Sequence, residues 1–167
     1  MKNKIIIYFL FFISFTLCQK SWYKGNLEGI NDLSFELNIK GVDDDVWEQR
    51  IYSYVKLRLL EEDIQVLNSL IPKMVIDINI FDSRIEVASS FLVQLSIYGY
   101  SISESEYYKS FSESRITKNM MTSKIFSQSI NGQTDSINLY KDIEKNIKSI
   151  IAVFIKQWYT DNPIKQF

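Results

Sequence analysis

Residues 33–40 read LSFELNIK, and apolar and polar side chains alternate at every position of this stretch. In an extended chain, side chains that are two residues apart lie on the same face, so the four apolar side chains share one face. The stretch therefore predicts a β-strand that is half-buried in a sheet, and Gly41 marks its end.

Later stretches predict three more strands. MVIDINI at residues 74–80 and FLVQLSI at residues 91–97 repeat the alternation. A fourth strand, from about Arg115 to Ile130, does not keep its apolar residues in one phase, which predicts a bulge or a bend within it. Gly132 predicts the turn that follows this strand, and Ile64 to Leu67 could form a short extended stretch.

A first helix is predicted to begin near Val46. Asp45 and Glu48 have the spacing of a capping box, in which each side chain accepts a hydrogen bond from a free backbone N–H of the first turn. Asp63 is expected to end the helix in a left-handed conformation. The apolar stripe of this helix consists of Trp47, Ile51, Val55 and Leu59.

A second helix is predicted from Ser136 to Tyr159, because its apolar residues recur at spacings of three and four, and Asn162 with Pro163 ends it. The predicted order is therefore β-α-β-β-β-α. Each strand has one apolar face, so both helices are expected on one side of a single mixed sheet. We predict an α+β fold, a two-layer sandwich that forms one domain over residues 19–167.

The first 18 residues predict export. Lys2 and Lys4 precede an apolar run from Ile5 to Leu17, whose 13 residues fall short of the roughly 20 that span a bilayer. This is typical of a signal peptide that is cleaved after Cys18, and it predicts a periplasmic or outer-membrane-associated protein. The alternative is a lipid attached to Cys18, although residues 15–17 lack the usual small residue before it. A membrane contact is expected only in that second case.

The composition argues against several classes of function. The 167 residues include 19 basic and 20 acidic ones, for a net charge of -1, so no cationic field favours nucleic acid. Histidine is absent and Cys18 is the single cysteine, which removes the usual residues of acid–base catalysis, thiol catalysis and zinc binding. The sequence also lacks the common nucleotide-binding and hydrolase motifs. No cofactor and no enzymatic activity are therefore expected.

Two acidic clusters have a functional and a structural interpretation. Residues 43–45 are three aspartates that could bind a hard cation, but they also match the acidic start of a helix. Glu61, Glu62 and Asp63 could supply the carboxylate pair of a glycoside hydrolase, or they could form a solvated patch at the end of a helix.

The face of the sheet opposite the helices is a candidate contact surface. Its predicted residues are mostly polar, namely Ser34, Glu36, Asn38, Asp77, Asn79, Gln94 and Ser96. Aromatic side chains interrupt them and continue into the serine-rich segment 101–114. Tyrosine offers a rigid contact area with a polar tip, so we predict a contact with a partner protein or a glycan. The candidate residues are Tyr98, Tyr100, Tyr107, Tyr108 and Phe111; alternatively, a hairpin folds back and buries these rings.

An export signal followed by LSFELNIK, MVIDINI, FLVQLSI and a helix ending in QWYTDNP resembles the small bacterial envelope lipoproteins of the lipopolysaccharide-assembly type. The resemblance covers most of residues 19–167 as an order of elements, without a diagnostic functional motif, and the residues before Cys18 depart from the family's lipid-attachment pattern. It implies a protein that acts as a plug or chaperone for an outer-membrane barrel.

The sequence leads to one main functional hypothesis and two alternatives. The main hypothesis is a noncatalytic exported binding or assembly module of the cell envelope, accessory to an outer-membrane or transport complex and bound to a protein partner. The alternatives are a hydrolase that acts through carboxylates and a structural subunit that self-associates through a sheet edge.

Overall fold

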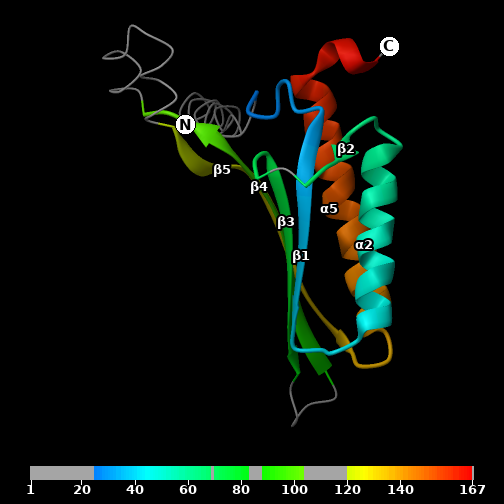
Figure 1. The fold of residues 1–167 in the computed structure, drawn as a ribbon. Coiled ribbons are helices and arrows are strands. Elements are labelled where there is room, and N and C mark those ends of the chain that lie inside the picture. The colour runs from blue at the N-terminus through cyan, green and yellow to red at the C-terminus, as the bar shows by residue number, and fades with distance from the viewer. Residues whose placement is uncertain (1–24, 69, 83–87, 104–119, 167) are drawn as a thin grey trace, which may run out of the picture.

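The computed structural model describes residues 25–68, 70–82, 88–103 and 120–166. Within these ranges, five strands, two α-helices and one short 3-10 helix follow one another along the chain (Figure 1). They are β1 (Asp32–Lys40), α2 (Asp45–Leu60), β2 (Gln65–Val66), β3 (Lys73–Asp82), β4 (Ala88–Ser101), β5 (Met121–Asp135), α5 (Leu139–Asp161) and η1 (Pro163–Gln166).

The strands form one mixed sheet in the order β2-β1-β3-β4-β5. Strand β1 is parallel to both β2 and β3, whereas β4 is antiparallel to its neighbours β3 and β5. The predicted α+β class, with two helices and a single mixed sheet, is confirmed. The short extended stretch predicted at Ile64 to Leu67 is β2. The predicted order did not count it as a strand, because a strand of two residues has no alternation to detect and forms by pairing with Asp32 and Leu33.

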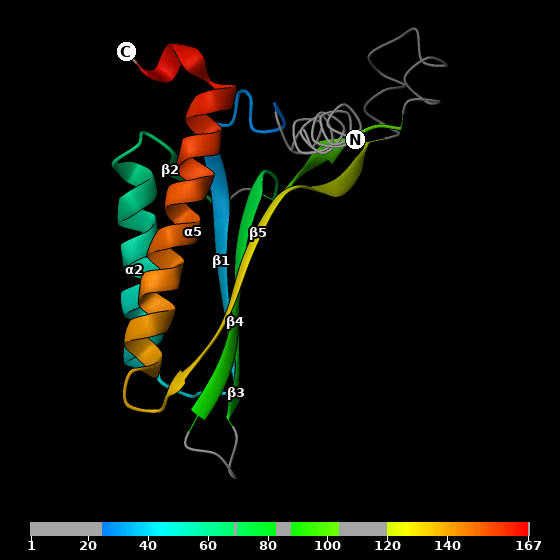
Figure 2. The same cartoon turned by 180° about the vertical axis from the view of Figure 1, so that it is seen from behind.

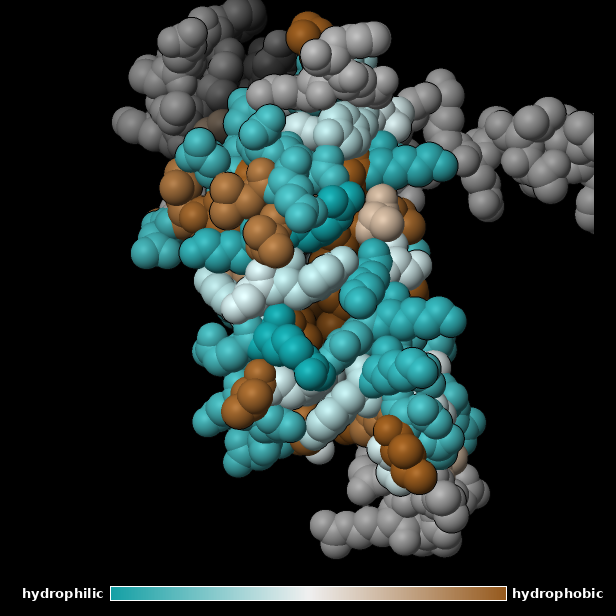
Figure 3. Space-filling model, turned by 90° about the vertical axis from the view of Figure 1, so that its right-hand side faces the viewer, coloured by the Kyte–Doolittle hydropathy of each residue, from teal (hydrophilic) through white to brown (hydrophobic). Residues whose placement is uncertain are grey.

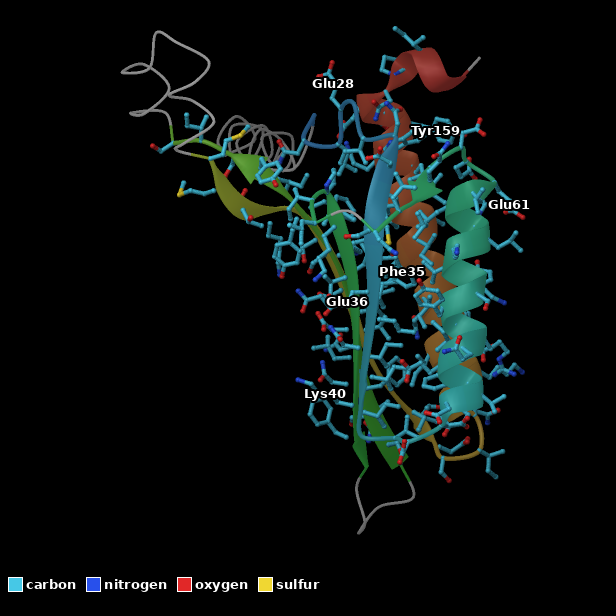
Figure 4. All side chains as sticks on the ribbon, in the orientation of Figure 1. Glu28, Phe35, Glu36, Lys40, Glu61 and Tyr159 are labelled. Carbon is cyan, nitrogen blue, oxygen red and sulfur yellow. The ribbon has the colours of Figure 1, made fainter. Side chains whose placement is uncertain are left out.

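Both helices lie on the same side of the sheet in the two opposite views of Figures 1 and 2. The buried apolar residues of α2 and α5 join those of the strands in one hydrophobic core. Phe35 and Glu36 illustrate the alternation, since Phe35 points toward the helices and Glu36 points away from them (Figure 4). Phe35 stacks on Tyr52 of α2, with ring centroids 5.0 Å apart.

The ends of the helices differ in detail from the prediction. Asp44 is the N-cap of α2, and its carboxylate accepts a hydrogen bond from the backbone N–H of Trp47 at 3.0 Å. The prediction placed Asp45 in this role, and it was wrong because adjacent aspartates cannot be told apart by pattern alone. Asp63 adopts the predicted left-handed conformation, with φ 59°. Helix α5 begins at Leu139 rather than at residue 136.

Strand β5 confirms one prediction and contradicts another. The pairs Ile97–Phe126 and Tyr98–Lys124 leave Ile125 as an extra residue, which is the predicted bulge. Gly132 does not form the turn after the strand but lies within β5, opposite Phe91. A Cβ at Gly132 would be only 2.5 Å from the Phe91 ring, so the ring packs directly over the glycine.

Candidate binding groove and open sheet face

The face of the sheet turned away from the helices carries polar side chains that bond across the strands. Asn38, Asp77, Gln94 and Ser129 lie side by side on β1, β3, β4 and β5. The amide of Asn38 donates to the Asp77 carboxylate at 3.0 Å, and the amide of Gln94 donates to the Ser127 hydroxyl at 3.3 Å. We call this surface the open face.

An ion pair crosses between strands on the open face. Lys73 on β3 forms an ion pair with Glu36 on β1. Lys73 also donates a hydrogen bond to the Glu36 carboxylate, and Asn38 donates a second one. Both bonds lower the pKa of the Glu36 carboxyl below its ordinary value, the one from Lys73 more strongly. Ser96, predicted to point outward, lies on this face but is 1% exposed, and its hydroxyl has no hydrogen-bond partner among the described residues.

Tyr98 and Tyr100 lie at the bulged end of the open face, where the sequence predicted a contact surface. Tyr98 is paired with Lys73 on one side and with Lys124 on the other. The ammonium of Lys124 lies 5.8 Å from the centroid of the Tyr98 ring, within the range of a cation–π interaction. Tyr100 is more accessible, with 55% of its surface exposed.

A hollow of about 420 Å³ opens beside Tyr100. It lies between the bulged ends of β4 and β5 and the turn that precedes β1, and we call it the bulge groove. Gly99 lets the Ile125 side chain approach the floor of the groove, because a Cβ there would lie 2.8 Å from the Ile125 Cδ1 atom. The lining residues are Asn26, Glu28, Ile30, Pro72, Gly99, Tyr100, Ser101, Ser123, Lys124 and Ile125.

Residues 25–30 form one wall of the bulge groove, and they are fastened to the sheet and to α5. The amide of Asn26 donates to the backbone carbonyl of Ile125 at 3.0 Å, which joins the turn to the bulge. The indole N–H of Trp158 donates to the carbonyl of Ile30 at 2.7 Å. The wall is therefore held at both of its ends.

The end of α5 completes this attachment, which we call the terminal clasp. The buried carboxylate of Asp161 accepts hydrogen bonds from the backbone N–H groups of Gly25, at 2.8 Å, and Leu27, at 3.2 Å. The amide of Asn162 accepts from the N–H of Gly29 at 2.8 Å and donates to the carbonyl of Leu27 at 2.9 Å. The sequence did not predict the clasp, because its partners are more than 130 residues apart.

The carboxylates of the second acidic cluster, Glu61 and Glu62, bind neighbouring side chains. Glu61 and Glu62 both form ion pairs with Arg58, and Glu62 also accepts a hydrogen bond from the Tyr159 hydroxyl at 2.6 Å. This bond raises the pKa of Tyr159, because it favours the protonated phenol. Figure 4 shows Glu61 on the outer side of α2. In the part of the chain that the structure describes, no three potential metal ligands come together.

A second, smaller hollow of about 210 Å³ lies between α2 and α5. Ile51 and Ile147 line it, and an ion pair between Arg50 and Glu144 spans the two helices. This side of the molecule is largely hydrophilic, with separate hydrophobic patches (Figure 3). Neither described helix is long and apolar enough to cross a membrane.

Several predicted residues lie outside the described part of the chain. They are Cys18, with the rest of the predicted signal peptide, and Tyr107, Tyr108 and Phe111 of the serine-rich segment. Of the predicted contact residues, Tyr100 lines the bulge groove and Tyr98 lies beside it. Asn26, Glu28 and Lys124 were missed as lining residues, because no local pattern indicates that residue 26 meets residue 125.

No protein-family model matches the chain, and no curated protein does. A solved structure of a neuraminyllactose-binding hemagglutinin homolog from Helicobacter pylori matches with 9% identity and a TM-score of 0.39, over 84% of this chain and 92% of that one. Rare lipoprotein B from Shewanella oneidensis matches with 9% identity and a TM-score of 0.30, over 81% and 96%. The chain thus has a weak fold resemblance to a hemagglutinin homolog and to a lipoprotein, and it matches no sequence family.

Proposed function

We propose that the chain is a noncatalytic, exported binding module of the bacterial cell envelope, which holds a protein partner in the bulge groove. The observation that carries this proposal is the placement of an exposed tyrosine, Tyr100, at a preformed hollow between Lys124 and Glu28. The backbone of Tyr100 is fixed by strand pairing with Thr122, and a tyrosine ring provides contact area at a low cost in conformational entropy.

The groove is preorganised by contacts on each of its sides. The Asn26 hydrogen bond and the terminal clasp hold one wall, and the pairing of Tyr100 with Thr122 holds the other. Lys124 and Glu28 offer one positive and one negative group at the rim, which suits the mixed polar groups of a protein surface. A groove of this kind favours recognition with little rearrangement.

The cellular location is part of the same proposal. The basic start and the apolar run of residues 5–17 support export, with either cleavage after Cys18 or lipid attachment at Cys18. Cys18 precedes Gly25 by seven residues, which span at most about 25 Å when fully extended. A lipid on Cys18 would therefore keep the bulge groove within that distance, plus the size of the turn, of the membrane surface.

The experiment compares two exposed aromatic residues on the open face. Tyr100 lines the groove, whereas Phe81, which is 61% exposed, lies on β3 near the opposite end of the sheet. A photoreactive phenylalanine is placed at position 100 or 81 in cells, and the cross-linked envelope protein is identified by mass spectrometry. We expect one dominant cross-linked protein from position 100, and we expect that this protein is not cross-linked from position 81.

Purified partner then gives the quantitative test. Tyr100→Ala should weaken binding at least about tenfold, as for a central interface tyrosine, while Phe81→Ala should leave the Kd within about twofold. Neither variant should lower the melting temperature, because both side chains are exposed. Equal binding by both variants, or equal losses, would contradict the assignment of the groove.

A further inference from the structure

Strand β5 forms one long edge of the sheet. Its 15 residues pair with β4 on one side, and it is the last strand in the order of the described sheet. Natural sheets usually protect such an edge with charged residues, proline or short strands. Residues 125–134 of β5 read IFSQSINGQT and contain neither a charged residue nor a proline. This edge is therefore long and unprotected by charge.

The helix beside this edge carries mostly uncharged residues on the side that faces it, with Asp142 as the exception. The Thr134 hydroxyl of β5 donates to the Asp142 carboxylate of α5 at 2.6 Å, which identifies the helix face next to the strand. The residues that follow Asp142 at helical spacing share that face, namely Asn146, Ser149, Val153 and Gln157. Val153 is 38% exposed there.

The lysines of α5 lie on other sides of the helix. Lys148 is directed toward α2, with its ammonium 5.6 Å from the centroid of the Tyr54 ring. Lys141, Lys145 and Lys156 fall on the helical rows farthest from the sheet. In the surface formed by residues 125–134 of β5 and the adjoining strip of α5, Asp142 is thus the one charged residue, and it is hydrogen-bonded to Thr134. Depletion of charged residues is the compositional mark of an interface core.

We propose that a second copy of this chain pairs its β5 with this β5, antiparallel, about a two-fold axis perpendicular to the sheet. Such an axis keeps the helices of both copies on the same side, so the two strips of α5 face each other. The partner strand then has the same length, the same twist and the same lack of charge. The result is a continuous sheet of ten strands.

The size of the contact reaches the lower end of the range for stable protein interfaces. Nine residues of strand extend about 30 Å, and a sheet with a helix layer is roughly 20 Å deep, which gives on the order of 600 Å² for each copy. A standard interface buries about 800 Å² for each partner. Main-chain hydrogen bonds between the two β5 strands add to this area.

The dimer leaves the bulge groove accessible. The bulge at Ile125 interrupts the regular edge, so pairing over residues 126–134 stops short of the groove. Because the strands are antiparallel, the two grooves lie at opposite ends of the shared sheet. The dimer and the proposed function are therefore independent, and either can fail without the other.

Sedimentation equilibrium of the purified protein tests the proposal. We expect dimers at micromolar concentrations. Ser129→Lys with Asn131→Lys places like charges across the pair and should weaken dimerisation at least about tenfold. The matched control, Asn79→Lys with Ser90→Lys, adds the same charge to β3 and β4 on the open face and should leave the dimer unchanged.

A second pair of variants with opposite charge distinguishes repulsion between the two β5 strands from a loss of folding. Mixing the β5 lysine variant with a Ser129→Glu/Asn131→Glu variant should restore a dimer that contains one copy of each, which an unfolded chain could not form. The proposal would be overturned if the wild type stayed monomeric up to about 1 mM. It would also be overturned if the β5 lysine variant dimerised as well as the wild type, or if the control variant lost as much dimer as the β5 variant. Protection of the β5 amides from hydrogen exchange only when another protein is added would overturn it as well.

Discussion

The two faces of the sheet are built from the same strands but have opposite properties. On β3, Ile76 and Ile78 are completely buried beneath the helices, whereas the alternate residues Asp77 and Asn79 are only half-buried on the open face. The covered face holds one continuous apolar core, and the open face holds hydrogen bonds and an ion pair. The contrast indicates that stability resides mainly on the covered face.

The largest effect is expected from truncating a side chain on the covered face. Ile76→Ala should lower the free energy of unfolding by about 2–5 kcal/mol, because it leaves a cavity between the sheet and the helices. Asn79→Ala, three residues along the same strand but on the open face, should cost less than about 1 kcal/mol. Urea denaturation of both variants measures the difference, and equal costs would remove the distinction between the faces.

An intermediate effect on stability is expected at Gly132, where the Phe91 ring packs against a position without a side chain. Gly132→Ala places a methyl group against the Phe91 ring, so we expect a loss of about 1–3 kcal/mol from overpacking. Phe91→Leu in the same chain removes part of the ring and should recover some of this loss. A double-mutant cycle followed by urea unfolding measures the coupling, and strictly additive losses would show that the ring is not responsible.

Gly132 also shows which features of the fold a sequence pattern can predict. Alternation predicted β1, β3 and β4 because each has a side buried against a core, and helical spacing predicted α2 and α5 for the same reason. Gly132 was misread as a turn because its real partner, Phe91, is distant in the sequence. The local pattern singled out Tyr98 and Tyr100, of which Tyr100 lines the groove, whereas the opposite wall depends on the contact between Asn26 and Ile125.

The smallest effect is expected on the open face, from the ion pair of Glu36 and Lys73. Lys73 lowers the folded-state pKa of Glu36, so the pair stabilises the protein above the ordinary glutamate pKa. This stability should decrease as the pH falls below about 4.5 and disappear once Glu36 is protonated in the folded state as well. Both side chains are more than a third exposed, which limits the contribution to about 0.2–1 kcal/mol after solvent screening.

Unfolding of Glu36→Gln at pH 7 and at progressively lower pH measures this contribution. The variant should be slightly less stable than the wild type at pH 7, and the two curves should converge in acid. A gap that persists at low pH would show that Glu36 acts through its packing rather than through its charge.

The terminal clasp has a mechanical consequence. A pull on the chain through Gly25 passes directly into the last turn of α5, because Asp161 binds the backbone on both sides of residue 26. The strands then carry little of that load until the clasp opens. If the protein works while tethered by its N-terminal segment, tension would reach the wall of the bulge groove first, and the sheet would remain intact while the groove loosens.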